Sequence, residues 1–594
     1  MYTDDKNAQV ILALLKSYGI KKVVVSPGTT NVPISRSVQL DPWFEVYSVV
    51  DERSAAYFAG GLSYASGEPV VISCTGATAS RNYLPGLTEA FYRKLPIIAL
   101  TSQIHNSDFG NLTPQVTDRT TSQNDVKRES VLLPVIKDDE DYERCVISAN
   151  KALIAATTRG GGPVHINLHV VGDYSFTTNK LPDVRKIEHY GNDQLLSSID
   201  GLSEILSNKK VGIFLGAHRR FNKQSQDELE RFAIKYKAPV FIDHTSGYTG
   251  KNSVLISQFF DLKRSKNRPE LLIDLGSVSG EYSAGWLNGV ETWRLSEDGE
   301  IHDRFHCQTK LFDGSEGTFF SAFSTIRPGI QEDYVKQILT EVGSIVVPRD
   351  DMPLSNTYIS YSLSRLLPRG SNLHLGILNS LRNMNFFKLH DTISPSSNVG
   401  GFGIDGALST LIGQSMADKN KLTFGLLGDL AAFYDMNALG IRHIRNNLRI
   451  LLVNNDGGVE FRLNERLETQ WSNETDEFIS ASGHNGSIKG WAESMNFHYV
   501  SADNKKDFDH KIKEFSSPRL DKFSKPVLFE VFTTIPDEQK GIGVIQKVNQ
   551  QHTEEITTPS IRHTTTAKQK IKRSLSRIAP ETAKKIYRKL RSRG

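Results

Sequence analysis

Short apolar runs alternate along the chain with segments whose apolar residues recur at helical spacing. Near the start, Ala8–Tyr18 has the spacing of a helix and Lys22–Ser26 that of a buried strand. The pair repeats as a helix over Ala55–Ser66 and a strand over Val70–Cys74. Strands that alternate with helices are typical of α/β folds built on a parallel sheet. We therefore expect a parallel sheet in the first part of the chain.

The same alternation restarts twice. A second unit begins at Lys210 with VGIFLGAH and continues with a helix over Asp227–Lys237 and the strands PVFID and ELLIDLG. A third unit follows Val347-Pro348-Arg349, with a helix over Ser355–Leu366 and a strand over Leu373–Leu378. Polar residues and prolines interrupt the pattern near 179–189 and 342–353. The predicted organisation is α/β, with three doubly wound, Rossmann-like domains over residues 1–180, 190–345 and 350–545, followed by a basic C-terminal segment over 546–594.

Composition limits the class of protein. The 594 residues suffice for three or four domains, and 38% hydrophobic and 23% charged residues are ordinary for a globular protein. No apolar run approaches the length of a membrane span, and the acidic N-terminus does not resemble a secretory signal, so a cytoplasmic location is expected. Three cysteines without CxxC spacing argue against a disulfide framework or a zinc site.

The net charge of +4 is a property of the C-terminal segment, because residues 568–594 hold eleven Lys and Arg against one Glu. Short apolar stripes accompany these charges, one formed by Ile571, Leu575 and Ile578. Basic charge beside an apolar stripe fits an anionic membrane surface at the inner face of the membrane, and a solvated, disordered tail is the alternative. No recognised nucleic-acid motif accompanies the charges, so nucleic acid is not expected as a partner.

Two strand ends in the third unit have the residues of a cation site. Gly428-Asp429 ends the apolar run TFGLL, and a helix is expected over Leu430–Ile444. A second strand, Ile450–Val453, leads into Asn454-Asn455-Asp456-Gly457-Gly458. Carboxylate and amide oxygens suit Mg²⁺, with Mn²⁺ or Ca²⁺ as alternatives, and free N–H groups at a helix start bind phosphate. The pattern predicts a diphosphate held through a divalent cation; Gly-Asp alone would also fit an ordinary strand, turn and capped helix.

A charged triplet, Asp51-Glu52-Arg53, follows an apolar strand in the first unit. Two other strands of this unit run into small or polar residues, Ser26-Pro27-Gly28 and Cys74–Ala79. Strand ends of an open α/β sheet line one ligand crevice, so these segments are expected to meet there. The simpler interpretation of Asp51 and Glu52 is a charge pair favoured at a helix start.

Gly-Asp followed 26 residues later by Asn-Asn resembles the cofactor motif of thiamine diphosphate enzymes. From Leu14 to about Ile545 the chain is similar to the MenD-type 2-succinyl-5-enolpyruvyl-6-hydroxy-3-cyclohexene-1-carboxylate synthases of menaquinone biosynthesis, which add decarboxylated 2-oxoglutarate to isochorismate. The similar stretches include SPG at Ser26, DER at Asp51, NYLPGLTEAF, WRLSEDGEIHDRF, NSL at Asn379, GIDGALST, GDLAAFYDMNAL and VNNDGG.

The resemblance implies roles for individual residues. Glu52 would be the acid that bonds N1′ of the aminopyrimidine, and Ile404 the wedge that bends the cofactor, both catalytic. Asp429, Asn455 and the Gly457 carbonyl would bind the metal ion. The remaining cofactor-binding residues would be Ser26, Pro27, Gly28, Thr75, Gln115, Gly428, Leu430 and Ala431. The cofactor would lie between the first domain of one chain and the third of another, which implies a homodimer or homotetramer.

The arginines with which these synthases bind substrate carboxylates are largely absent. Where they have Ser-Arg-Ser, Asp-Arg and Asn-Arg-Gly, this chain has Thr29-Thr30-Asn31, Gln103-Ile104 and Asn398-Val399-Gly400. A guanidinium group matches a carboxylate bidentately, so less anionic or hydroxyl-rich substrates are expected. The candidate pocket residues are Thr29, Thr30, Asn31, Gln103, His105, Ser380 and Val399.

The function predicted from the sequence is a thiamine diphosphate- and Mg²⁺-dependent decarboxylase that acts on a 2-oxoacid. It would pass the acyl anion to an acceptor other than isochorismate, in surface-polysaccharide or other specialised biosynthesis. Three alternatives are the menaquinone-pathway synthase proper, a simple 2-oxoacid decarboxylase that releases an aldehyde, and a catalytically silent scaffold. The presence of Glu52, Asp429 and Asn455 weighs against the scaffold.

Overall fold

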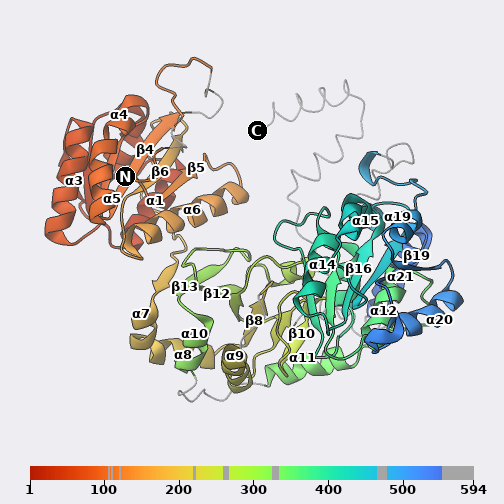
Figure 1. Ribbon diagram of the computed structural model, residues 1–594. Coiled ribbons are helices and arrows are strands. Elements are labelled where there is room, and N and C mark those ends of the chain that lie inside the picture. Colours follow the sequence, from red (N-terminus) through yellow and green to blue (C-terminus); the bar gives the residue numbers. More distant parts are fainter. Residues whose placement is uncertain are drawn as a thin grey trace, which may run out of the picture.

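The computed structural model describes residues 1–104, 108, 111–118, 122–218, 223–258, 267–323, 333–463 and 478–550 (Figure 1). The predicted pocket residue His105 and the basic segment from residue 551 onward lie outside these ranges. Three sheets, each built from parallel strands with interleaved helices, follow one another along the chain. The α/β fold predicted from the sequence is confirmed.

The first sheet has the strand order β2-β1-β3-β4-β6-β5. Successive residues such as Val23 and Val24 are both buried but pack on opposite faces, one with α1, α2 and α6 and the other with α3 and α5. Both faces are therefore covered, as in a doubly wound sheet. Its strands are β1 Lys22–Val25, β2 Glu45–Ser48, β3 Val70–Thr75, β4 Ile97–Ile104, β5 Glu129–Leu133 and β6 Val164–Val170. Its helices are α1 Lys6–Ser17, η1 Thr29–Asn31, α2 Val32–Leu40, α3 Glu52–Ser66, α4 Ala77–Asn82, α5 Leu84–Arg93 and α6 Asp139–Thr157.

The second sheet has the order β10-β9-β8-β11-β12-β13-β7. Helices α8, α9 and α10 pack on one face, and η4 and α11 on the other. Its strands are β7 Glu188–Tyr190, β8 Val211–Leu215, β9 Val240–Ile242, β10 Ser253–Leu255, β11 Leu271–Leu275, β12 Glu291–Ser296 and β13 Gln308–Asp313. Its helices are α7 Asn192–Ser197, α8 Ile199–Ser207, α9 Lys223–Lys235, η4 Tyr282–Leu287, α10 Glu316–Ala322 and α11 Tyr334–Gly343.

The third sheet has the order β15-β14-β16-β17-β19-β18. Its strands are β14 Asn372–Leu375, β15 Ser394–Ser397, β16 Thr423–Gly428, β17 Leu448–Asn454, β18 His498–Ala502 and β19 Val527–Phe532. Its helices are α12 Asn356–Leu366, α13 Asn379–Asn385, α14 Ala407–Ala417, α15 Asp429–Tyr434, η6 Met436–Gly440, α16 Glu460–Leu463, α19 Lys489–Ser494, α20 Lys505–Phe515, η7 Leu520–Lys522 and α21 Ile535–Gln550. Among the described residues, no helix has the length and apolar composition that crossing a bilayer requires.

The helix predicted over Leu430–Ile444 is wrong beyond its first turns. The α-helix ends at Tyr434, and a 3-10 turn over Met436–Gly440 follows. At the break, the Asp435 carboxylate accepts hydrogen bonds from the Ser409 N–H (2.6 Å) and Oγ (2.7 Å) at the start of α14. This contact between two helices outweighs the local helical pattern.

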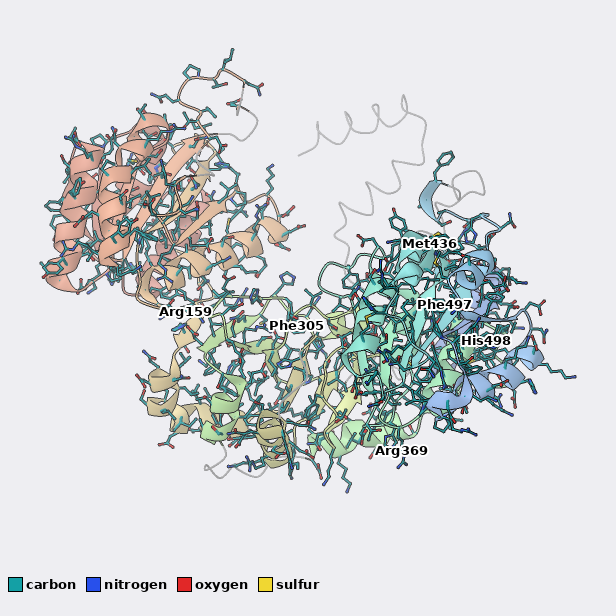
Figure 2. The ribbon with its side chains drawn as sticks, in the orientation of Figure 1. Arg159, Phe305, Arg369, Met436, Phe497 and His498 are labelled. Atoms are coloured by element: carbon teal, nitrogen blue, oxygen red, sulfur yellow. The ribbon has the colours of Figure 1, made fainter. Side chains whose placement is uncertain are left out.

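The three units contact one another in chain order. The first and second are joined by the Arg159–Asp313 ion pair (2.6 Å), and Arg159 lies at their junction (Figure 2). The second and third are joined by buried bonds, among them Asn385 Nδ2 to Glu281 (2.9 Å). The first unit stands apart from the third, with the second between them (Figure 1).

Candidate active site

Asp429 lies at the carboxyl end of β16, in the middle of the third sheet. Strands β16 and β17 pair so that Gly428 is opposite Val453, which brings Asp429 beside the segment after β17. Its Oδ2 accepts the N–H groups of Asn455 (3.0 Å) and Gly457 (3.1 Å). Only 2% of Asp429 is exposed, and this burial raises the pKa of its carboxyl group. A buried carboxylate at this position favours a positively charged ligand.

Asn455 provides a test of whether a metal ion fits here. Its Oδ1 is buried and has no hydrogen-bond partner within the described part of the chain. Gly457 allows the loop to pass close by, because its φ is +147° and a Cβ there would lie 2.7 Å from the Ser482 Cα. An unpaired amide oxygen beside a buried carboxylate is the donor set of a hard cation. The residues present therefore fit Mg²⁺, which Asp429 and Asn455 would hold.

His484 contacts this site and was not predicted. Its Nδ1 accepts the N–H of Gly486 (2.8 Å), so its Nε2 carries the hydrogen and donates to Asp429 Oδ2 (3.1 Å). The imidazole ring also packs edge-on against Phe433, with ring centroids 5.1 Å apart. His484 lies far from Asp429 along the chain, and no local pattern marks it.

Glu538, at the start of α21, is a second residue that sequence reasoning missed. It is fully buried and accepts hydrogen bonds from the Asn356 N–H (3.0 Å) and Thr533 Oγ1 (2.7 Å), and also from the Asn455 side chain. Burial raises the pKa of Glu538 to about 7, and the neighbouring Asp429 carboxylate adds to the shift.

Ile404 and the start of α15 lie next to this cation site. The partly buried Ile404 packs on the same apolar cluster as Ala431, while Leu430 donates its N–H to Asp429 Oδ1 (2.7 Å). The third unit therefore gathers the predicted residues near the carboxyl ends of the central strands β16 and β17: Ile404, Gly428, Asp429, Leu430, Ala431, Asn455 and Gly457. Their roles remain predictions.

In the first unit the structure separates the two neighbouring carboxylates. Asp51 caps α3, since its Oδ1 accepts the N–H of Ser54 (2.8 Å). Glu52 is partly exposed, and its Oε2 accepts a bond from Asn82 Nδ2 (3.3 Å). The capping role therefore belongs to Asp51, and Glu52 is left available to a ligand.

The ends of β1, β2 and β3 meet beside Glu52, as expected. Ser26 Oγ donates to the Val49 carbonyl (2.8 Å), which anchors the Ser26-Pro27-Gly28 turn. Gly28 lies so close to Thr75 that a Cβ would come within 2.8 Å of the Thr75 Cβ. Thr30 Oγ1 bonds Thr75 Oγ1 and the Ser102 carbonyl.

Of the remaining predicted residues, those that the structure describes do not form one open pocket within a single chain. Asn31 is fully buried, and its Oδ1 accepts a hydrogen bond from the Ser73 hydroxyl (2.7 Å). Val399 packs in the apolar core of the third unit. Gln103 and Ser380 are also buried, whereas Thr29 and Gln115 are exposed.

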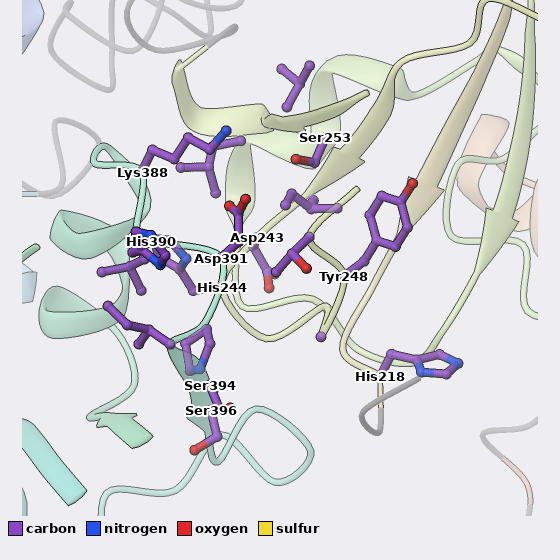
Figure 3. Close-up of a pocket in the computed structure, with 18 of the residues that line it drawn as sticks. His218, Asp243, His244, Tyr248, Ser253, Lys388, His390, Asp391, Ser394 and Ser396 are labelled. Atoms are coloured by element: carbon purple, nitrogen blue, oxygen red, sulfur yellow. The ribbon is translucent and has the colours of Figure 1, made fainter. Parts of the chain in front are cut away.

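A cavity of about 600 Å³ lies elsewhere, between the second and third units (Figure 3). Asp243 and Tyr248 line it from one side, and Lys388 and His390 from the other. None of the predicted site residues within the described ranges lines this cavity. Glu52 and Asp429 thus lie on separate units, and the described part of one chain does not bring them together (Figure 1).

Known proteins are similar to this chain over both the first unit, which carries Glu52, and the third unit, which carries Asp429. Residues 5–127 match the family model "Thiamine pyrophosphate enzyme, N-terminal TPP binding domain". The chain is 33% identical to the 2-succinyl-5-enolpyruvyl-6-hydroxy-3-cyclohexene-1-carboxylate synthase of Bacteroides fragilis over 90% of its own length and 97% of that protein. It is 27% identical to the synthase of the same name from Flavobacterium psychrophilum, over 89% and 96% of the two chains.

Proposed function

Because the chain belongs to the family of 2-succinyl-5-enolpyruvyl-6-hydroxy-3-cyclohexene-1-carboxylate synthases, which are thiamine diphosphate enzymes that form carbon–carbon bonds, we propose that it decarboxylates a 2-oxoacid and transfers the resulting acyl group to an acceptor other than isochorismate. We further propose that a divalent cation, ordinarily Mg²⁺, holds the cofactor diphosphate. The unpaired Asn455 Oδ1 beside the Asp429 carboxylate is the observation that supports the cation site.

When bound, thiamine diphosphate would supply a nucleophilic carbon, formed by loss of the proton on its thiazolium ring, for addition to the oxoacid carbonyl. The protein's own part is positioning and proton transfer. Asp429 and Asn455 would hold the cation, while Ile404 packs against the same cluster and would support the bent cofactor. Glu52 would hold or release a proton at N1′ of the aminopyrimidine, and the capping bond of Asp51 leaves it free to do so.

Calorimetric titration of thiamine diphosphate with Mg²⁺ into the wild type and Asp429→Ala tests the cofactor. We expect binding by the wild type and its loss in the variant. A ligand held at 100 times its Kd stabilises a protein by about 2.7 kcal/mol, so a thermal scan should show the same contrast. A wild type that binds neither component would refute the proposal and favour a non-catalytic scaffold.

The proposed change of acceptor is supported by three positions. Thr30, Ile104 and Val399 stand where the similar synthases have arginine, and Thr30 is already bonded to Thr75 and to a backbone carbonyl. Losing one bidentate charge contact costs about 1.5–3 kcal/mol, so three losses remove most affinity for a highly anionic substrate pair.

The donor and the acceptor are tested with a panel of 2-oxoacids, each with and without isochorismate, on the cofactor-loaded enzyme. We expect little turnover with isochorismate and 2-oxoglutarate. Efficient turnover of that pair would instead identify the menaquinone-pathway synthase. Aldehyde release without any acceptor would identify a simple decarboxylase.

We also propose that the active unit is a dimer in which each site takes Glu52 from one chain and Asp429 from the other. Helix α3 carries Glu52 and exposes Tyr57 (49%), Phe58 (43%) and Tyr64 (68%). Exposed aromatic residues this close together are typical of a surface that a partner covers.

Mixing two inactive variants tests this arrangement. Glu52→Gln and Asp429→Ala dimers have no intact site, but in a two-fold mixed dimer one of the two sites is intact, so random exchange should restore about a quarter of the wild-type activity. If both residues acted within one chain, the mixture would remain inactive.

A further inference from the structure

Two asparagines in succession leave the end of β17, and each bonds a buried glutamate. Asn454 Nδ2 donates to Glu530 Oε1 (2.8 Å), and the Asn455 side chain hydrogen-bonds Glu538. Neither glutamate is exposed to solvent. Each also accepts a hydroxyl hydrogen bond, Glu530 from Tyr499 (2.7 Å) and Glu538 from Thr533 (2.7 Å). The two glutamates are therefore equally buried, and Glu530 accepts a second hydroxyl hydrogen bond, from Ser487 (2.6 Å).

The two asparagines differ in whether the side-chain oxygen has a hydrogen-bond partner. Asn454 Oδ1 accepts the N–H of Asp456 (3.3 Å), so both ends of this amide are bonded within the protein. Asn455 Oδ1 is buried and has no partner among the described residues. Only the second pair thus leaves an oxygen for a ligand, and the backbone N–H of the same residue, Asn455, donates to the Asp429 carboxylate (3.0 Å).

A glutamate can fix the orientation of an asparagine amide. In its ionised form Glu538 only accepts hydrogen bonds, so this form requires the amide to turn its Nδ2 toward Glu538 and its Oδ1 away. The reverse orientation would place Oδ1 against the carboxylate oxygens and leave Nδ2 where a cation is expected. Glu538 is itself held by the Asn356 N–H and the Thr533 hydroxyl, which leaves it little freedom to move.

We propose that Glu538 is a positioning residue that turns Asn455 Oδ1 toward the divalent cation of the cofactor site. The proposal rests on the proposed function, because it assumes that a cation binds beside Asp429. Replacing groups that orient metal ligands typically weakens metal affinity by about 10–100-fold.

The test is calorimetric titration of Mg²⁺ in the presence of saturating thiamine diphosphate. For Glu538→Gln we expect Mg²⁺ to bind about 10–100-fold more weakly, because a glutamine amide can accept or donate and no longer fixes Asn455. Adding Asn455→Asp to this variant should recover the binding, since the new amide at 538 can donate to the carboxylate introduced at 455 and leave its second oxygen for the cation. Asn455→Asp alone is the control for the added charge: beside the intact Glu538 carboxylate it has no donor at that position, so it must bind Mg²⁺ more weakly than the double variant.

Glu530→Gln is the matched control, since it removes an equally buried carboxylate from the neighbouring asparagine. We expect it to lower the unfolding temperature and leave the Mg²⁺ affinity unchanged. If Glu538→Gln does not fold, Glu538→Asp keeps the charge but shortens the side chain, and must still weaken Mg²⁺ binding.

Three results would overturn the positioning role. They are unchanged Mg²⁺ affinity in a folded Glu538 variant, equal weakening by Glu530→Gln, and no recovery in the double variant. Failure of the wild type to bind thiamine diphosphate and Mg²⁺ would instead overturn the proposed function, so the two failures are distinguishable.

Discussion

The close contact between α3 and α5 makes Gly86→Ala an informative substitution. Gly86 lies on α5, and an added Cβ would meet Ala56 Cβ at 2.5 Å, the Ala56 carbonyl carbon at 3.0 Å and the Tyr57 nitrogen at 3.1 Å. Carbon atoms normally pack at about 3.5–4.0 Å, so the helices must separate by about 1 Å. No flexible side chain can absorb the overlap. Overpacking of this kind costs about 1–3 kcal/mol of stability.

The displacement should also reach the proposed catalytic acid. Ala56 lies one helical turn after Glu52 on α3, so a shift of the helix at Ala56 moves Glu52 as well. A misplacement of about 1 Å can lower turnover by about 10²-fold. We therefore expect Gly86→Ala to lose both stability and kcat, even though Gly86 is not predicted to contact a ligand.

Urea unfolding and steady-state kinetics on the cofactor-loaded enzyme measure the two effects. Gly201→Ala is the control, since Gly201 lies exposed on α8 with no atom within 4 Å of the added Cβ. It should gain up to about 1 kcal/mol from helix propensity and keep full activity. Wild-type stability and kcat in Gly86→Ala would refute the reasoning that the two helices cannot separate without moving Glu52.

Three further predictions concern the third unit. Burial lowers the pKa of His374 to about 4, below its unfolded value near 6.5. Because the unfolded chain then takes up this proton more readily than the folded one, the contribution of His374 to stability is complete above about pH 6.5 and is lost as the pH falls toward 4. Between pH 7 and pH 5 this loss should be about 2 kcal/mol in urea unfolding, and His374→Asn should remove it; an unchanged pH slope would contradict the assignment. The fully buried Arg449 donates hydrogen bonds to three backbone carbonyls in residues 515–519. Arg449→Met should therefore lower the free energy of unfolding by at least about 3 kcal/mol in the same assay. A loss below about 1 kcal/mol would show that those carbonyls find other donors. Asp435→Ala removes both bonds to Ser409 at the start of α14 and should lower the free energy of unfolding by about 1–2 kcal/mol; an unchanged value would mean that this contact does not end the helix.

The sequence was sufficient for the fold class and for the placement of Asp429 and Asn455 at neighbouring strand ends of the third unit. The apolar runs of β16 and β17 are buried strands, and each ends where a polar residue begins, so the position of Asp429 and Asn455 follows from local pattern. The helix predicted to end at Ile444 failed because the pattern contains no information on the bond between Asp435 and Ser409.

The contacts around those ligands could not be predicted in the same way. His484 and Glu538 contact Asp429 and Asn455 from distant parts of the chain, and neither stands in a recognisable sequence motif. The burial of Asn31 and Val399 could not be predicted from the sequence either, because it depends on how whole helices and strands pack together. Sequence therefore indicated which atoms could bind a cation, and only the structure showed what holds them.

The pairing of β16 with β17 has a consequence for how the site can vary. The distance between Asp429 and Asn455 is fixed by the opposition of Gly428 and Val453 across the sheet, not by the residues that join the strands. Insertions or deletions between Gly440 and Asn447 would lengthen or shorten the connection without moving either ligand. A single residue added within β17 would instead turn every following side chain to the opposite face of the sheet. Searches for this site in distant sequences should therefore hold the two strand ends fixed and let the spacing between them vary.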